Sequence, residues 1–187
     1  MTNQNTKLIV EGALMIALAT VLSMIKFFEL PQGGSITLEM LPLVIMGLRN
    51  GTKWGCFTGF VHGLLQMILG FSNVMYCATL TAQIGCILLD YLLAFTCLGL
   101  APAFASFFKG NKVLGATVGA VICGVLRFIC SFLSGWLLWG SYAPEGMSPV
   151  IYSFAYNASY MIPDTIILAV VTAILCKSVP KLLKPAA

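Results

Sequence analysis

The sequence predicts an all-α integral membrane protein in which six transmembrane helices form one bundle. Of its 187 residues, 59% are hydrophobic and only 9% are charged, whereas a soluble domain carries roughly 25% charged residues. Long apolar runs and an uneven distribution of lysine and arginine support the same prediction. We expect a single membrane domain over residues 1–187, with no separate soluble domain.

The apolar runs define the predicted spans, because a helix needs about 20 apolar residues to cross the hydrocarbon core. Four runs are long and clear, and two shorter runs lie between the first and second of these. The earlier short run contains Pro42, so we expect a tilted or broken helix that lines a cavity. The six predicted spans are residues 8–28, 36–48, 54–69, 80–104, 113–138 and 151–176.

The basic residues test this count. With the N-terminus in the cytoplasm, the outer loops hold Lys26 beside Glu29, Glu39 and Glu145. The inner segments hold Lys7, Arg49, Lys53, Lys109, Lys112, Lys177, Lys181 and Lys184. This distribution satisfies the positive-inside rule, and five or seven spans would spoil it, so we expect both termini in the cytoplasm. The net charge of +4 follows from this bias and gives no indication of nucleic-acid binding.

Small residues recur at the spacing of helix-packing motifs. Such rows let helices approach closely and predict contacts inside the bundle. Ala13 and Ala17 form a flat patch on the first span, which either packs internally or docks a partner subunit. The glycine rows are Gly55, Gly59 and Gly63 on the third span and Gly115 and Gly119 on the fifth.

The sequence predicts no metal or cofactor site. The seven cysteines include no C-x-x-C pair, and we interpret them as packing residues. His62 is the only histidine and has no cysteine or carboxylate at ligand spacing. The sequence has no G-x-x-x-x-G-K-[ST] loop, so any ATP-driven activity requires another subunit.

Asp90 is the only charged residue within residues 80–104, and an ion at membrane depth is rarely present without a partner or a task. Arg127 lies on the next, antiparallel span. At 1.5 Å per residue, both residues are about 15–17 Å below the outer surface, so an Asp90–Arg127 ion pair is geometrically reasonable. Either the two residues only neutralise each other, or Arg127 orients Asp90, which keeps a lone pair for a ligand.

Aromatic and polar side chains accompany this pair. Trp139 and Tyr91 beside a carboxylate suit a cationic, planar ligand. Asn157 lies on the sixth span close to Tyr152, and it makes either an interhelical hydrogen bond or a polar contact to a ligand. The outer loop over residues 140–149 is either a lid over an outward-facing pocket or part of an interfacial aromatic belt.

Several motifs in the chain match a known family. They are the segment Leu89-Asp90-Tyr91-Leu92-Leu93-Ala94-Phe95 and a block containing Arg127-Phe128, Ser134-Gly135, Trp139, Tyr142-Ala143-Pro144-Glu145-Gly146, Tyr152-Ser153 and Tyr156-Asn157. With these motifs, nearly the whole chain resembles the thiamine-specific substrate-binding (S) component of energy-coupling-factor (ECF) vitamin transporters. The resemblance implies high-affinity capture of the vitamin from outside, in a pocket closed by the loop after the first span. It also implies assembly with a membrane coupling subunit and two ATPase subunits, which use the ATP.

The resemblance also assigns residues. It implies that Asp90, Tyr91, Gly135, Trp139, Tyr152 and Asn157 bind the substrate, and that Ala13 and Ala17 meet the coupling subunit. We add two residues to the substrate-binding set: Arg127, as the predicted partner of Asp90, and Ser131, at the position of a family histidine. Asp90 and Ser131 stand where family members carry glutamate and histidine, and the first outer loop lacks the family's tryptophan. The implied protein is not an enzyme, needs no cofactor of its own and resides in the bacterial plasma membrane.

Three alternatives to this interpretation remain open. The chain could be an S component for another small vitamin or precursor. It could be a small intramembrane enzyme that uses His62 or Ser131. It could also be an ion-coupled carrier that works without any ATPase, although the sequence shows no inverted repeat of the kind such carriers contain.

Overall fold

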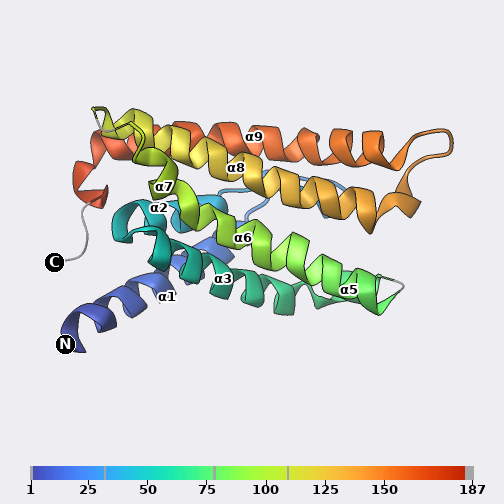
Figure 1. The fold of residues 1–187 in the computed structure, drawn as a ribbon, viewed down its shortest axis with the longest axis horizontal. Helices are drawn as coiled ribbons and strands as arrows, with labels where there is room; N and C mark the ends of the chain where they lie inside the picture. Colours follow the sequence, from blue (N-terminus) through green and yellow to red (C-terminus); the bar gives the residue numbers. More distant parts are fainter. Residues whose placement is uncertain (1, 32, 78, 109, 184–187) are drawn as a thin grey trace.

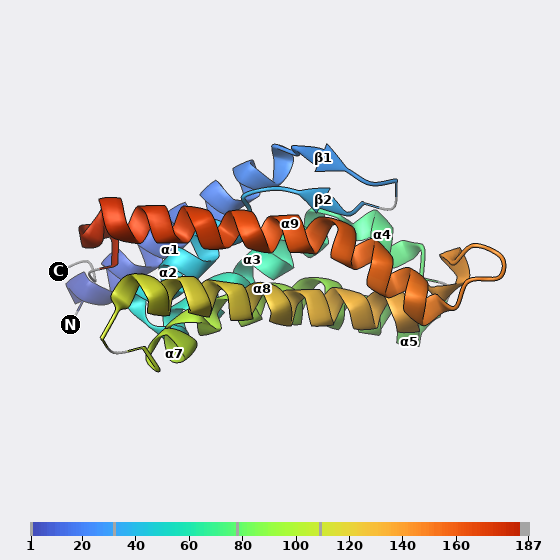
Figure 2. The same cartoon turned by 90° about the horizontal axis from the view of Figure 1, so that it is seen from above.

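The computed structural model describes residues 2–31, 33–77, 79–108 and 110–183, and Figure 1 shows them as an elongated helical bundle. Figure 2 shows a short hairpin, β1–β2, lying beside α9. The elements are α1 (Thr2–Met24), β1 (Phe28–Glu29), β2 (Ser35–Ile36), α2 (Met40–Asn50), α3 (Thr52–Leu69), α4 (Phe71–Met75), α5 (Leu80–Cys86), a π-helix (Ile87–Leu93), α6 (Ala94–Thr96), a 3₁₀ turn (Cys97–Leu100), α7 (Ala101–Ala105), α8 (Lys112–Leu137), a 3₁₀ turn (Gly140–Tyr142), α9 (Pro149–Ser178) and a 3₁₀ turn (Pro180–Leu183).

Four helical stretches of the described chain are long and apolar enough to cross a membrane. They are Gln4–Met24, Leu80–Ala105, Lys112–Leu137 and Pro149–Ser178, and they coincide within a few residues with the first, fourth, fifth and sixth predicted spans. α3 coincides with the third predicted span and has 18 residues. The protein is therefore all-helical in its main elements and built for a membrane.

The helix found in the predicted span 36–48 is too short to cross a bilayer, as a short or broken helix would be. α2 has 11 residues and is about 16 Å long, roughly half the thickness of the hydrocarbon core. Residues 35–36 belong instead to a hairpin, in which Phe28 pairs with Ile36. Pro42 is tolerated in α2 because it lies in the first turn, where a backbone N–H is not needed. Most of α2 is buried, so it fills the interior of the bundle.

The chain reverses direction between α2 and α3 at Gly51. Its φ of 88° lies in the left-handed region, and its N–H donates to Gly47 O at 2.7 Å. This turn, the α7–α8 connection, the start of α1 and the end of α9 all lie at one end of the molecule (Figure 1). The described residues of the predicted inner basic segments thus gather at the same end, whereas Lys109 and Lys184 lie outside the described residues.

The fourth long helix is irregular along its length. α5 begins with Thr79 as its N-cap, whose side chain accepts from Ala82 N at 3.2 Å. The helix then widens into the π-helix, tightens into a 3₁₀ turn and ends as α7. π-Helical segments inside α-helices often occur at functional sites. Asp90 and Tyr91 both lie on this one.

The glycine rows pack inside the bundle, as predicted. A Cβ on Gly59 would strike the carbonyl oxygen of Phe95, and a Cβ on Gly119 would strike that of Ala101. These contacts bring α3 and α8 against the irregular fourth helix. By contrast, Ala13 and Ala17 on α1 are exposed, so they do not pack against the rest of this chain.

Candidate ligand-binding site

Asp90 faces the outer part of α8. Its Oδ2 accepts a hydrogen bond from Ser134 Oγ at 2.5 Å and a longer one from Trp139 Nε1 at 3.4 Å. The thiol of Cys86, one turn earlier, also contacts the carboxylate. Because a carboxylate offers about four acceptor positions, Asp90 retains capacity for a ligand.

The predicted ion pair between Asp90 and Arg127 is wrong. Arg127 Nη2 lies 3.2 Å from Glu39 Oε2, and the guanidinium carbon lies 4.4 Å from the centroid of the Phe95 ring. Counting residues from the helix ends assumed that the two helices end at the same level. Asp90 in fact meets α8 at Ser134, which is seven residues beyond Arg127 and about 10 Å farther along the helix.

Glu39 is the acidic residue that sequence reasoning misplaced, because it was counted among the charges of an outer loop. It is only 6% exposed, and besides Arg127 it binds His62 Nε2 at 3.0 Å through Oε1. Gln66 Nε2 also donates to Oε1, and it donates to Ser23 Oγ at 2.9 Å. Glu39 stands directly before the apolar run of α2, and this position in the sequence was the signal that its side chain could be buried. We call Glu39, Arg127, His62 and Gln66 the Glu39 cluster.

Tyr91 points away from Asp90, towards the junction of α3 and α4. Its hydroxyl donates to Gly70 O at 3.1 Å. Tyr91 nevertheless belongs to the apolar cluster against which Trp139 packs; the other buried members are Val74, Cys77 and Cys86. Of the two aromatic residues predicted beside Asp90, only Trp139 hydrogen-bonds to the carboxylate.

Three predicted site residues lie where α8 and α9 meet. A Cβ on Gly135 would collide with Ser153 Oγ and lie 3.0 Å from Asn157 Nδ2, so the glycine permits this close approach. Asn157 is buried, and its Nδ2 donates to Ser153 O at 2.9 Å while its Oδ1 accepts from Tyr160 at 2.8 Å. Within the described part of the chain, these partners all lie on α9 itself, so the interhelical hydrogen bond that was one of the two alternatives for Asn157 is not observed. Ser131 lies near the Tyr160 hydroxyl.

Tyr152 begins a row of tyrosines along α9. Its ring centroid lies 5.9 Å from that of Tyr156, which lies 5.9 Å from that of Tyr160. All three rings are partly buried. The three rings thus form a continuous row along one face of α9.

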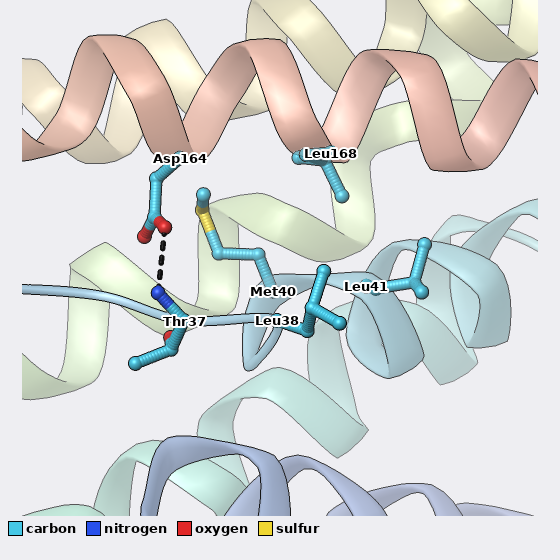
Figure 3. A pocket seen from close by; sticks show the side chains of 6 residues that line it. All are labelled: Thr37, Leu38, Met40, Leu41, Asp164 and Leu168. Carbon is cyan, nitrogen blue, oxygen red and sulfur yellow. Dashed lines mark hydrogen bonds between the residues drawn. The ribbon is translucent and has the colours of Figure 1, made fainter. Parts of the chain in front are cut away.

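The first outer loop, residues 25–39, rests on α9. Gly34 N donates to the Tyr156 hydroxyl at 3.0 Å, and Thr37 N donates to Asp164 Oδ1 at 2.8 Å. A Cβ on Gly34 would lie 2.7 Å from ring carbons of Tyr160, so the backbone is pressed against the tyrosine row. Figure 3 shows the Thr37–Asp164 bond at the base of this loop. The loop is thus bonded to α9 at two points.

Two hollows lie close to these elements. One is too narrow for a water molecule and is lined by Thr37, Leu38, Met40, Leu41, Asp164 and Leu168 (Figure 3). The other, of about 200 Å³, is apolar and is lined by Val125, Phe128, Phe154, Met161, Ile162, Thr165 and Ile166. Asp90 and Trp139 line neither of them.

The outer aromatic residues divide between two roles. Trp139 contacts Asp90, as described above, and its ring centroid lies 5.8 Å from that of Tyr142. Trp136 is 42% exposed, as expected for an interfacial anchor.

Comparison with known proteins decides the family. A family model described as "Thiamine transporter protein (Thia_YuaJ)" matches residues 9–184. The chain belongs to this family. Members are thiamine transporters, so the chain is a membrane transport protein and not an enzyme.

Individual relatives of the thiamine transporter family match over nearly the full length. The thiamine transporter ThiT of Bacillus subtilis (strain 168) is 36% identical, and the match covers 97% of each chain. The ThiT of Lacticaseibacillus paracasei is 29% identical over 93% of this chain and 89% of its own. The solved structure of ThiT from Listeria monocytogenes superposes with a TM-score of 0.81 at 27% identity, covering 98% of this chain and 100% of the other.

Proposed function

We propose that this chain is the high-affinity thiamine-binding S component of an ECF transporter, which captures the extracellular vitamin for uptake driven by partner subunits. The observation that carries this proposal is the Asp90 carboxylate beside the Trp139 ring, in a chain of the thiamine transporter family. A fold alone does not establish a ligand, so the proposal depends on the chemistry of these side chains.

The chemistry of the site suits thiamine. Thiamine carries a permanent thiazolium charge, a flat aminopyrimidine and a hydroxyl tail. Asp90 supplies a counter-charge or accepts from the amino group, and Trp139 offers an aromatic face to the cation. Arg127 Nη1 is buried and, among the described residues, has no hydrogen-bond partner, so it can donate to an oxygen of the ligand. Polar contacts are also proposed for Tyr91, Ser131, Tyr152 and Asn157, with Gly135 leaving space beside them.

The first outer loop acts as the closure of the site in this proposal. Its bonds to Tyr156 and Asp164 tie it to α9, and Glu39 at its end is anchored in the Glu39 cluster. Loops of this kind exclude water and commit a bound ligand. Release of Gly34 from the tyrosine row would open the path from outside.

The proposed topology has six membrane segments with both termini in the cytoplasm. The even number of passes is supported by the start of α1 and the end of α9 at the same end of the bundle (Figure 1). The short α2 would enter the bilayer as a buried partial pass. The exposed face of α1 with Ala13 and Ala17 is proposed to meet the membrane coupling subunit, and two ATPase subunits would complete the transporter.

Calorimetric titration of the purified, detergent-solubilised protein tests the ligand. We expect saturable thiamine binding at or below micromolar concentration, and weaker binding of other vitamins in a panel that includes riboflavin and pyridoxine. The proposal is wrong if micromolar thiamine produces no binding heat, or if another vitamin binds more tightly. Uptake of labelled thiamine into proteoliposomes then distinguishes ECF dependence from an autonomous carrier, because only the latter transports without coupling and ATPase subunits.

A further inference from the structure

The Glu39–Arg127 pair lies beneath the site that we assign to thiamine. We infer that Glu39 is a specificity-determining residue, which cancels the charge of Arg127 and so allows the site to accept a cation. This inference rests on the proposed capture of thiamine. It concerns the electrostatics of the site, since no ligand contact is assigned to Glu39.

Arg127 belongs to the same side of α8 as the candidate site. Ser131 and Ser134 follow it by four and seven residues, the spacing that places side chains on one helix face. Ser134 holds Asp90, and the rise from Arg127 to Ser134 is about 10 Å. The permanent positive charge of Arg127 therefore lies on the same face of α8 as the proposed binding site for a cation.

The magnitude of this repulsion is large enough to matter. Two unit charges about 10 Å apart, at an effective dielectric constant of 20, change a binding equilibrium by about tenfold. Solvent screening gives little relief, because the side chains of Arg127 and Glu39 are 14% and 8% exposed. A negative charge fixed directly on Arg127 removes most of the repulsion.

Glu39 is held in the position that this role requires. His62 and Gln66 from α3 bind Oε1, which leaves Oε2 for Arg127. The Phe95 ring lies against two members of the Glu39 cluster: the Arg127 guanidinium is above its face, and the His62 ring is 4.9 Å away between centroids. Asp164 also lies within electrostatic reach of Arg127, but Glu39 is the carboxylate that contacts the guanidinium, at 3.2 Å. Glu39 is therefore the main counter-charge.

The test compares thiamine with 3-deazathiamine, a neutral isostere in which carbon replaces the charged thiazolium nitrogen. We expect Glu39→Gln to weaken thiamine binding about tenfold more than binding of the isostere. The reason is that the uncompensated charge of Arg127 repels the thiazolium cation and has no net charge to repel in the isostere. Adding Arg127→Gln to Glu39→Gln should restore the wild-type ratio of the affinity for thiamine to the affinity for 3-deazathiamine. Gln66→Ala is the matched control: it removes a neutral member of the Glu39 cluster and should leave the ratio unchanged.

Arg127→Gln alone gives an independent measurement with the opposite sign. It leaves Glu39 unbalanced, so the ratio should shift further in favour of thiamine. This variant and the double variant carry the test if Glu39→Gln does not fold. The inference is overturned if the Glu39 and Arg127 variants change both affinities by equal factors, which would make the pair purely structural. Failure of the wild-type protein to bind thiamine would instead reject the proposed function.

Discussion

Ser134 Oγ donates a hydrogen bond to Asp90 Oδ2 across the interface between α8 and the π-helical segment of the fourth helix. The bond fixes the carboxylate on the side of Trp139, whose indole nitrogen reaches the same oxygen. Asp90 is thus held by neutral donors, while Arg127 is matched by Glu39. The Asp90 carboxylate and the Glu39–Arg127 pair are therefore separate polar groups.

The Asp90 carboxylate should contribute directly to ligand affinity. Loss of one charge from a buried charged contact typically costs about 2–5 kcal/mol, so Asp90→Asn should weaken thiamine binding by at least tenfold in calorimetric titrations. The amide keeps the shape of the side chain and an oxygen that can accept from Ser134. An unchanged affinity with a lower melting temperature would show that Asp90 is only structural.

The two tryptophans near the outer end of α8 should report differently on the ligand. Trp139 contacts Asp90, whereas Trp136 is 42% exposed. We expect thiamine to quench the fluorescence of the Trp136→Phe variant as in the wild type, and to leave that of Trp139→Phe nearly unchanged. Persistent quenching in Trp139→Phe would place the ligand away from Asp90.

Gly34 should control how long the ligand stays bound. A Cβ at this position lies 2.7 Å from the Tyr160 ring, so Gly34→Ala must push the first outer loop away from α9. We expect thiamine dissociation, measured by stopped-flow fluorescence, to accelerate several-fold or more. Gly110→Ala is the control, because a Cβ there meets open space. Equal dissociation rates in the two variants would argue against the loop as a closure.

Gly59 should matter for stability and not for ligand chemistry. Its missing Cβ lets α3 touch the Phe95 carbonyl, and overpacking of such a contact typically costs about 1–3 kcal/mol. Gly59→Ala should therefore lower the melting temperature in detergent, measured by thermal shift, by more than Gly110→Ala does. A melting temperature equal to that of the wild type would show that α3 and the fourth helix accommodate the added methyl group without loss of stability.

Local patterns were enough to locate most of the helices and to single out Asp90 as a candidate site residue. Runs of apolar residues marked α1, α3, the fourth helix, α8 and α9, because the length of a membrane helix is set by the thickness of the bilayer. The lone charge at Asp90 pointed to a polar site, since an ion in the bilayer needs a partner or a task. Glycine spacing marked the close contacts of α3 and α8 in the same way.

Long-range contacts were beyond such patterns. The partner of Arg127 is Glu39, 88 residues away along the chain, and no local spacing relates the two. The π-helix, the β1–β2 hairpin and the docking of Gly34 on Tyr156 likewise depend on how distant segments pack. Composition and periodicity describe each helix separately, so relative depth and rotation were left undetermined.

The sequence alone determined the membrane-embedded helical class, the approximate helix positions and the choice of Asp90. It could do so because a segment that lies in lipid must satisfy the bilayer through its own residues. Only the tertiary structure decided which acid meets which base. Ion pairs at membrane depth form between whichever side chains packing brings within about 4 Å, and packing placed Arg127 on Glu39 and left Asp90 to Ser134 and Trp139.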